Sequence, residues 1–264
     1  MRVLFFEKIC DIIRANPTFA QTRIRNYENY RGLIMLKELK QRVFEQNLSL
    51  YKQGLVMLTW GNVSAIDREN GLMAIKPVGV PYDKLTEADI VIVDMVTKRP
   101  VDKKQRPSVD TPTHIYLYEN FPEIGGIVHS YSTSAVAWAQ AGLSIPAFGI
   151  MQADTFSGEI PCTRALTKPE ITGDYERNVG KVIVETFKNF DPKKTPAVLV
   201  QNHGPFVWGV TPEQAVDNAA ALEEVAKAAI LTRQLNPVAT PADESLLKKR
   251  HSSQHGKNSA YGRK

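Results

Sequence analysis

Cysteine is scarce in this chain, whose 264 residues include only Cys10 and Cys162. The two are far apart and form no C-x-x-C pair, which excludes a disulfide framework and a thiolate zinc site. Any bound metal must therefore be held by histidines and carboxylates. Histidine is also rare, with five residues in the chain, so the sequence offers few alternatives for such a site.

Long apolar runs are missing as well. No segment approaches the roughly 18 consecutive apolar residues that a membrane-spanning helix needs. The N-terminus also lacks the apolar stretch and small-residue cleavage site of a secretory signal. We therefore expect a cytoplasmic protein with no membrane partner.

Acidic residues are missing from the C-terminal part of the chain, where six cations and no acid follow Leu246. Residues 1–34 are basic too, with six cations and three acids. These two ends more than account for the net charge of +5 and the pI near 9.1, so the remaining body is slightly acidic. A basic tail on an acidic body argues against a nucleic-acid-binding face, and we expect no nucleic-acid partner.

The chain is long enough, and with 43% hydrophobic residues apolar enough, for one large domain. Residues 1–34 differ from the rest of the chain, because a short apolar patch leads into a polar, arginine-rich stretch. We interpret 1–34 as an N-terminal extension that is either disordered or translated from a start assigned too far upstream, and 35–264 as the domain. Apolar residues at helical spacing predict a helix that begins near Met35 and ends at Gly54.

Strands and helices alternate along the domain through short connections, which favours a single α/β domain of stacked layers. A cap at Asp110 or Thr111, followed by Pro112, marks the start of one helix. The predicted strands lie at 55–60, 63–66, 73–75, 125–129, 197–203 and 206–208, and the predicted helices at 112–121, 133–140 and 212–235.

Two of the five histidines, His129 and His203, directly follow apolar strands. Side chains at strand ends emerge at a sheet edge, a common setting for ligands and catalytic groups. Either histidine alone is equally well explained as a hydrogen-bonded structural residue. Together with Asp110 at the start of a neighbouring helix, they favour a metal site.

A series of short motifs occurs in the order seen in the class II aldolase family, and most closely resembles its L-ribulose-5-phosphate 4-epimerases. The resemblance extends from Met35 to the end of the chain. It implies a three-layer α/β/α fold around a mainly antiparallel sheet, assembled as a homotetramer with active sites between subunits. The motifs are Trp60–Ser64, Ile75–Gly79, Ser108–His114, Gly125–His129, Ala153–Asp154, Ile160–Arg164, His203–Phe206 and Ala260–Gly262.

The chemistry that the resemblance implies is metal-dependent epimerisation at C4 of L-ribulose 5-phosphate to D-xylulose 5-phosphate, a step of pentose and arabinose catabolism. A divalent metal, usually zinc, stabilises the charge formed when the C3–C4 bond breaks, and the aldehyde fragment is recaptured on its other face. Such a reaction needs proton acceptors and donors on both sides of C4. By position in the motifs, Asp154 and Tyr261 would fill these roles, with Tyr261 reaching in from a neighbouring subunit. The implied metal ligands are Asp110, His129 and His203.

The resemblance also assigns a phosphate-binding set. Its glycines allow backbone N–H groups to approach closely, and its lysine supplies a compensating charge. Taken alone, the Lys-Pro-Val-Gly run is no more specific than a turn. The matching residues are Gly61, Asn62, Lys76, Gly79 and Ser108.

The chain departs from the family pattern at several of these motifs. Tyr131 stands where the epimerases have a further histidine ligand, and Val78 and Val109 replace two serines of the phosphate-binding pattern. The run Ile150–Gln152 replaces Thr-Thr-His. Asp110 favours an epimerase over an aldolase, because family aldolases usually carry glutamate there. Two interpretations stay open: an active epimerase or aldolase on a related sugar phosphate, or a weakened homologue that serves as a sugar-phosphate-binding or assembly subunit.

Overall fold

The computed structural model describes residues 17–102 and 105–255 of the chain. These residues form one seven-stranded sheet in the order β4-β3-β2-β1-β5-β7-β6, and every neighbouring pair is antiparallel. The strands are β1 (Asn62–Asp67), β2 (Leu72–Ile75), β3 (Val91–Asp94), β4 (Arg99–Pro100), β5 (Gly126–His129), β6 (Ala197–Val200) and β7 (Gly204–Gly209).

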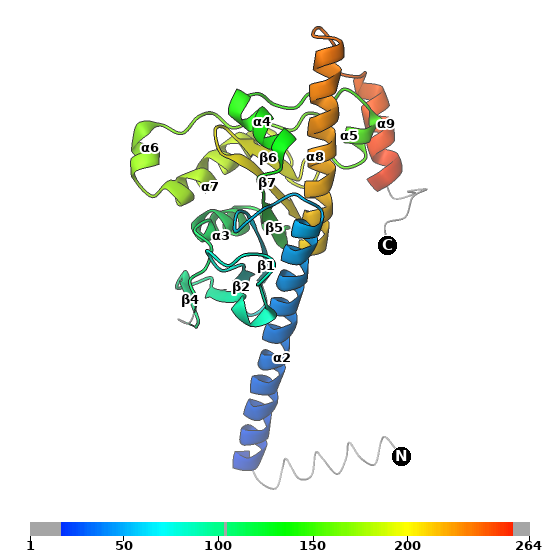
Figure 1. Ribbon diagram of the computed structural model, residues 1–264. Helices are drawn as coiled ribbons and strands as arrows, with labels where there is room; N and C mark the ends of the chain where they lie inside the picture. The colour runs from blue at the N-terminus through cyan, green and yellow to red at the C-terminus, as the bar shows by residue number, and fades with distance from the viewer. Residues whose placement is uncertain (1–16, 103–104, 256–264) are drawn as a thin grey trace.

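Helices cover both faces of this sheet (Figure 1). Because successive residues of a strand point to opposite faces, Ile127 of β5 packs among residues of α3 and α7, whereas Val128 packs among residues of α4 and α8. The expected three-layer α/β/α fold with a central antiparallel sheet is confirmed. The helices are α2 (Pro17–Lys52), α3 (Thr111–Asn120), α4 (Thr133–Ala141), α5 (Ile150–Ala153), α6 (Lys168–Thr172), α7 (Tyr175–Thr186), α8 (Pro212–Leu235) and α9 (Glu244–His255), with 3-10 turns η1 (Glu87–Asp89) and η2 (Phe187–Asn189).

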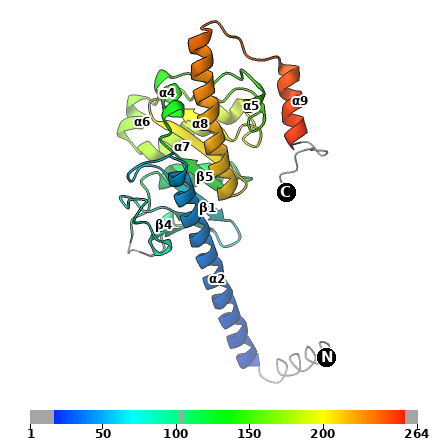
Figure 2. The same ribbon diagram turned by 45° about the vertical axis from the view of Figure 1, so that its right-hand side comes forward.

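The first helix begins earlier than the sequence pattern predicts. The expected start is near Met35, but α2 runs without a break from Pro17 to Lys52. Proline is tolerated in the first turn of a helix. No further proline occurs between Pro17 and Met35, where Gly32 has the lowest helix propensity. In both views the N-terminal half of α2 extends beyond the sheet (Figures 1 and 2). Its C-terminal half is held by Leu39 and Val43, which pack against β1 and β2.

The strand predicted at 55–60 is wrong, because this apolar segment is a loop and the first strand begins at Asn62. Leu58 has φ 54° and Gly61 has φ 75°, and these left-handed conformations interrupt an extended backbone. Leu55 and Val56 are buried in the core even so. The apolar run therefore reflects packing of a loop against the core rather than a strand.

The other predicted elements are confirmed within a few residues. The helix at 212–235 begins as expected, since the Thr211 hydroxyl accepts a hydrogen bond from the Gln214 backbone N–H at 3.2 Å. His203 lies in a turn rather than at a strand end, because β6 ends at Val200 and Asn202 is left-handed with φ 61°. None of the described helices combines the length and apolar character needed to cross a membrane.

Candidate metal centre and substrate site

Three potential metal ligands meet where the central strand β5 ends and its neighbours β1 and β7 begin. Asp110 immediately precedes α3, His129 ends β5, and His203 lies in the turn between β6 and β7. One ligand atom from each lies within 4.8 Å of the other two. The sheet register explains the meeting, because His129 pairs with Asn62 on one side and with Phe206 on the other. The structure therefore brings together all three residues that the sequence proposed as ligands.

His129 is oriented for metal binding by its own hydrogen bond. Its Nδ1 lies 3.0 Å from the carbonyl oxygen of Pro205, an acceptor, so Nδ1 carries the proton. Its Nε2 is buried and has no hydrogen-bond partner among the described residues. A buried nitrogen lone pair costs free energy unless a hydrogen-bond donor or a metal ion binds to it. The ring stacks on Phe206 with 4.3 Å between centroids, which fixes its plane.

Asp110 occupies the N-cap position of α3, but its side chain does not cap the helix. Its φ and ψ of −73° and −1° are already helical, and the carboxylate turns instead to Asn62, whose Nδ2 donates to Oδ2 at 2.8 Å. Burial on its own would raise the pKa of Asp110, but positive charge on His129, His114 and His203 and the Asn62 bond together lower it. The carboxylate is therefore ionised and free of a capping role.

His203 is the third member of the group and is held neutral. Burial lowers its pKa to about 4, with positive charge on His129 acting in the same direction and Asp110 opposing it. At neutral pH His203 is thus uncharged, and the site combines the Asp110 carboxylate with the imidazoles of His129 and His203, the donor types that bind zinc and similar divalent ions. Together with the unpartnered Nε2 of His129, this donor set fits a divalent metal.

Tyr131 lies beside the group. Its ring centroid is 4.8 Å from that of His129, 5.8 Å from that of Trp60 and 6.3 Å from that of His203. Burial, followed by the charge of Asp110, raises the pKa of the Tyr131 phenol. The phenol is therefore protonated at neutral pH and is a poorer ligand than a neutral imidazole.

Two of the expected phosphate-binding residues contact the metal group directly. The Asn62 amide donates to Ser108 Oγ at 3.0 Å as well as to Asp110, and its Oδ1 is buried without a partner among the described residues. The Ser108 backbone N–H donates to the Lys76 carbonyl at 3.0 Å. These hydrogen bonds place the chain around Lys76 beside the candidate metal centre.

Lys76 is almost fully buried, with 1% of its surface exposed. Its ammonium lies within 3.3 Å of the Thr59 carbonyl oxygen and 4.6 Å from the Tyr82 ring centroid. Burial lowers the pKa of Lys76 to about 8. Gly79, three residues further along the chain, is exposed and left-handed with φ 74°.

Gly61 packs closely against the backbone of His129, one of the candidate ligands. A Cβ at this position would lie 2.8 Å from the His129 carbonyl oxygen and 2.6 Å from Cγ1 of Val56, in addition to the φ of 75°. No L-residue fits there without displacing β5 or the loop. The Trp60–Asn62 turn is therefore built around this glycine.

Asp154, the expected acid/base group, lies on a different part of the structure. It follows α5, and the Arg250 guanidinium of α9 donates to both of its carboxylate oxygens, from Nε to Oδ1 and from Nη2 to Oδ2, the latter at 2.9 Å. His251 lies with Nδ1 3.1 Å from the Ala153 carbonyl oxygen, so α9 is docked on α5. Tyr261 lies outside the described residues.

Sequence reasoning missed two residues near these groups. Tyr175 opens α7 and places its hydroxyl 3.5 Å from Nδ1 of His203, and Arg250 holds Asp154. Tyr175 lies 28 residues before His203 in a polar stretch, and Arg250 resembles one cation among several in a basic tail. No local pattern marks either one, because both act through contacts with residues distant in the sequence.

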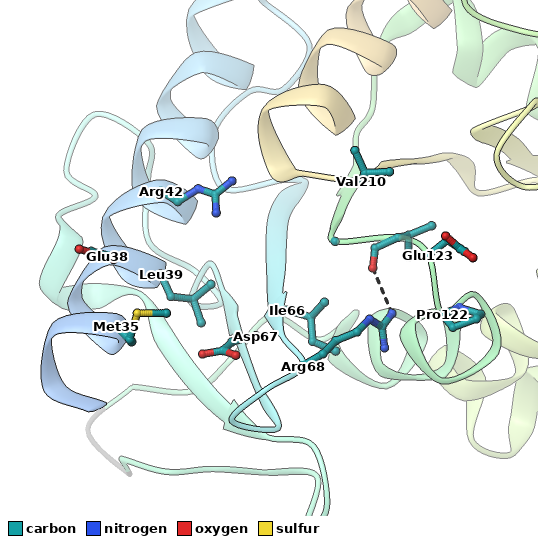
Figure 3. A pocket seen from close by; sticks show the side chains of 12 residues that line it. Met35, Glu38, Leu39, Arg42, Ile66, Asp67, Arg68, Pro122, Glu123 and Val210 are labelled. Carbon is teal, nitrogen blue, oxygen red and sulfur yellow. Dashed lines mark hydrogen bonds between the residues drawn. The ribbon is translucent and has the colours of Figure 1, made fainter. Parts of the chain in front are cut away.

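A pocket of about 510 Å³ lies at the opposite end of β1 and β5 from the candidate metal centre (Figure 3). Arg68 lies beside it, and one of its guanidinium nitrogens donates to the Ile124 carbonyl at 3.0 Å. Arg42, also in the wall, is engaged with Glu213 at 2.8 Å. The residues that line this pocket include no histidine. The presence of a pocket therefore does not by itself identify the reactive site of this protein.

The fold and the site define a class of protein. Residues 41–230 match the family model described as the class II aldolase and adducin N-terminal domain, and the chain belongs to this family. Among curated proteins, it is 51% identical to L-ribulose-5-phosphate 4-epimerase UlaF of Salmonella paratyphi B over 229 residues, which cover 87% of this chain and 100% of that protein. It is 52% identical to the protein of the same name from Salmonella paratyphi C, with the same coverage.

Solved structures agree on the fold. An L-fuculose 1-phosphate aldolase superposes with a TM-score of 0.70 at 24% identity, covering 82% of this chain and 95% of that one. YgbL from Escherichia coli, described as a putative aldolase/epimerase/decarboxylase, gives a TM-score of 0.66 at 20% identity and covers 83% of this chain and 100% of that one. At these identities the likeness shows the fold alone.

Proposed function

We propose that this protein is a metal-dependent isomerase that epimerises L-ribulose 5-phosphate at C4, in the cytoplasm, as part of pentose catabolism. The observation that carries the proposal is the group of Asp110, His129 and His203, in which a buried imidazole lone pair has no partner among the described residues. The relatives named L-ribulose-5-phosphate 4-epimerase, 51 and 52% identical, support the choice of substrate.

Asp110, His129 and His203 would hold the metal, which we propose to be zinc. When bound there, zinc supplies Lewis-acid stabilisation for negative charge on the substrate oxygens during cleavage of the C3–C4 bond. The Pro205 carbonyl keeps the His129 lone pair directed at the group, and Asn62 holds the Asp110 carboxylate in place. The residues of the chain thus preorganise the donor set before any ligand arrives.

For the phosphate we propose Gly61, Asn62, Lys76, Gly79 and Ser108 as the binding set. Lys76 has a pKa of about 8, so in most molecules its amine is protonated at neutral pH. The resulting ammonium attracts the phosphate dianion. Val109, which is 59% exposed beside Ser108, offers no hydroxyl donor. We therefore expect weaker phosphate binding than in a site with serine at that position.

We propose Asp154 as one acid/base group and Tyr261 of a neighbouring subunit as the other, which requires a homotetramer with sites at subunit interfaces. α9 ends at His255, six residues before Tyr261. An extended chain of six residues spans at most about 20 Å, so docking of α9 on α5 limits where Tyr261 can act. Residues 1–34 remain in this proposal an extension of the catalytic domain.

Metal analysis of the purified protein, combined with an assay for D-xylulose 5-phosphate formed from L-ribulose 5-phosphate, tests the proposal. We expect one zinc per chain and turnover that Asp154→Asn abolishes. Glu213→Gln is the matched control, because Glu213 is also paired with an arginine but belongs to no proposed catalytic group. Turnover that persists unchanged in Asp154→Asn would remove this residue from the mechanism.

Tyr131 is the observation that favours a second candidate function, a weakened homologue that binds sugar phosphate or assembles with an active relative. Its phenol stands beside His129 where the family pattern expects an imidazole, and its raised pKa disfavours the phenolate. Absence of metal and turnover in the natural chain, with both restored by Tyr131→His, would establish this alternative. Turnover of an aldol cleavage substrate without C4 inversion would instead identify an aldolase on a related sugar phosphate.

A further inference from the structure

The two candidate histidine ligands are held in different ways. His129 ends a strand in the middle of the sheet, is fully buried and stacks on Phe206. His203 lies in a turn beside the exposed, left-handed Asn202. The backbone therefore fixes His203 less firmly, and its ring needs a partner to hold one orientation.

Tyr175 is placed to be that partner. It is the first residue of α7, where its backbone N–H donates to the Gly173 carbonyl at 3.0 Å. Its ring packs against the core cluster between α7 and the sheet. From this anchored position its hydroxyl reaches to 3.5 Å from Nδ1 of His203, with the two ring centroids 6.0 Å apart.

We propose that Tyr175 is a positioning residue for the metal centre: its hydroxyl holds the His203 ring so that Nε2 faces the site, as the Pro205 carbonyl does for His129. The inference rests on the proposed metal centre and deepens it. When Nδ1–H of His203 donates to the Tyr175 oxygen, the lone pair is on Nε2, the tautomer that a metal requires. Metal-binding histidines commonly have such a partner on the second ring nitrogen.

Tyr131 does not share this role. It contacts His203 only as a tilted ring at 6.3 Å between centroids, and its closer neighbours are His129 and Trp60. The site therefore contains two tyrosines with separable functions. Tyr131 occupies the position of the missing ligand, whereas Tyr175 acts through His203.

The pair of variants Tyr175→Phe and Tyr131→Phe tests the assignment, because each keeps its ring and loses only a hydroxyl. Zinc affinity is measured by competition with a chromophoric chelator on the full chain, and cobalt(II) absorption reports the coordination geometry. Loss of a partner that orients a ligand typically lowers metal affinity about 10- to 100-fold. We expect such a loss, with a changed cobalt spectrum, for Tyr175→Phe and little change in affinity for Tyr131→Phe.

The thermal midpoint of each metal-free protein separates this role from a merely structural one. Without metal, we expect Tyr175→Phe to have the same thermal midpoint as the natural chain. On addition of zinc, its thermal midpoint should rise less than that of the natural chain. Equal zinc affinity and equal cobalt spectra in the natural chain and Tyr175→Phe would overturn the inference while leaving the metal centre intact. A natural chain that binds neither metal would overturn the proposed function, and this inference with it.

Discussion

The Nδ1 of His129 lies 3.0 Å from the carbonyl oxygen of Pro205, which stands two residues after His203. The turn that supplies one candidate metal ligand therefore also orients the other. Because β5 and β7 are paired through His129 and Phe206, a displacement of this turn changes both histidines together. The donor set therefore depends on the end of β5, the turn before β7 and the start of α3 together, rather than on isolated side chains.

Gly61→Ala should disturb this arrangement directly. The new methyl group would lie 2.8 Å from the His129 carbonyl oxygen on a backbone with φ 75°. We expect the free energy of unfolding to fall by about 2–4 kcal/mol, from left-handed strain plus overpacking, and metal affinity to fall with it. Urea unfolding and zinc titration measure the two effects.

Gly71→Ala is the matched control for this prediction. Gly71 is also left-handed, with φ 64°, but a Cβ there would meet nothing within 4 Å. Only the backbone strain of about 1–2 kcal/mol applies, with no change in metal affinity. Equal losses of unfolding free energy and of metal affinity in the two variants would show that the contact with His129 contributes nothing to either quantity.

The stability of the metal-free protein should decrease as the pH falls from about 6.5 to 5. Burial lowers the pKa of His114 to about 3 and that of His203 to about 4, whereas a histidine in the unfolded chain titrates near about 6.5. Below that pH the unfolded chain binds more protons, so each histidine removes up to about 1.4 kcal/mol per pH unit. Carboxylates contribute to the pH dependence of the unfolding free energy only at lower pH.

Urea unfolding of the natural chain and of His203→Asn across this pH range provides the measurement. The variant lacks one of the two depressed histidines, so its unfolding free energy should decline less steeply with falling pH. A stability that is flat or rises as the pH falls from 6.5 would contradict the burial of two neutral histidines.

The sequence predicted the layers and the ligand candidates because those depend on local patterns. His129 follows a short apolar strand, and Thr211-Pro212 opens α8; both can be recognised within a few residues. The resemblance to the class II aldolase family assigned Asp110 as a ligand, whereas residue patterns alone placed it at the start of a helix near the two histidines.

The sequence misled where tertiary packing decides. Residues 55–60 are apolar because they cover the core, yet the left-handed Leu58 prevents a strand. The pairing of Tyr175 with His203 and of Arg250 with Asp154 joins residues 28 and 96 positions apart. Such contacts exist only after the sheet and α9 are in place, so no spacing rule reveals them.

Lys76→Met should weaken phosphate binding without destabilising the protein. Lys76 is 1% exposed and its ammonium lies against carbonyl oxygens and the Tyr82 ring, so folding gains little from its charge. A lost charge-assisted hydrogen bond of about 1.5–3 kcal/mol corresponds to about a 10- to 100-fold rise in the inhibition constant of inorganic phosphate. Competition kinetics and thermal unfolding measure the two expectations.

Lys84→Met controls for the loss of positive charge in the same loop, because Lys84 is exposed. We expect its phosphate inhibition constant to remain close to that of the natural chain. If both variants weaken phosphate equally, the effect is general electrostatics and Lys76 has no direct contact with the phosphate.

Arg250→Gln should lower kcat while leaving KM and global stability nearly unchanged. The guanidinium donates hydrogen bonds to both carboxylate oxygens of Asp154. Because the two side chains are 30% and 34% exposed, the ion pair contributes at most about 1 kcal/mol to folding. Its release lets the carboxylate rotate and loosens α9, and misplacement of an acid/base group costs about 10- to 100-fold in rate. The measurements are steady-state kinetics and hydrogen exchange across α9.

Arg42→Gln is the control, because it breaks the comparable pair with Glu213 and should leave kcat unchanged. An unchanged kcat in Arg250→Gln, with faster hydrogen exchange in α9, would mean that docking of this helix does not position Asp154.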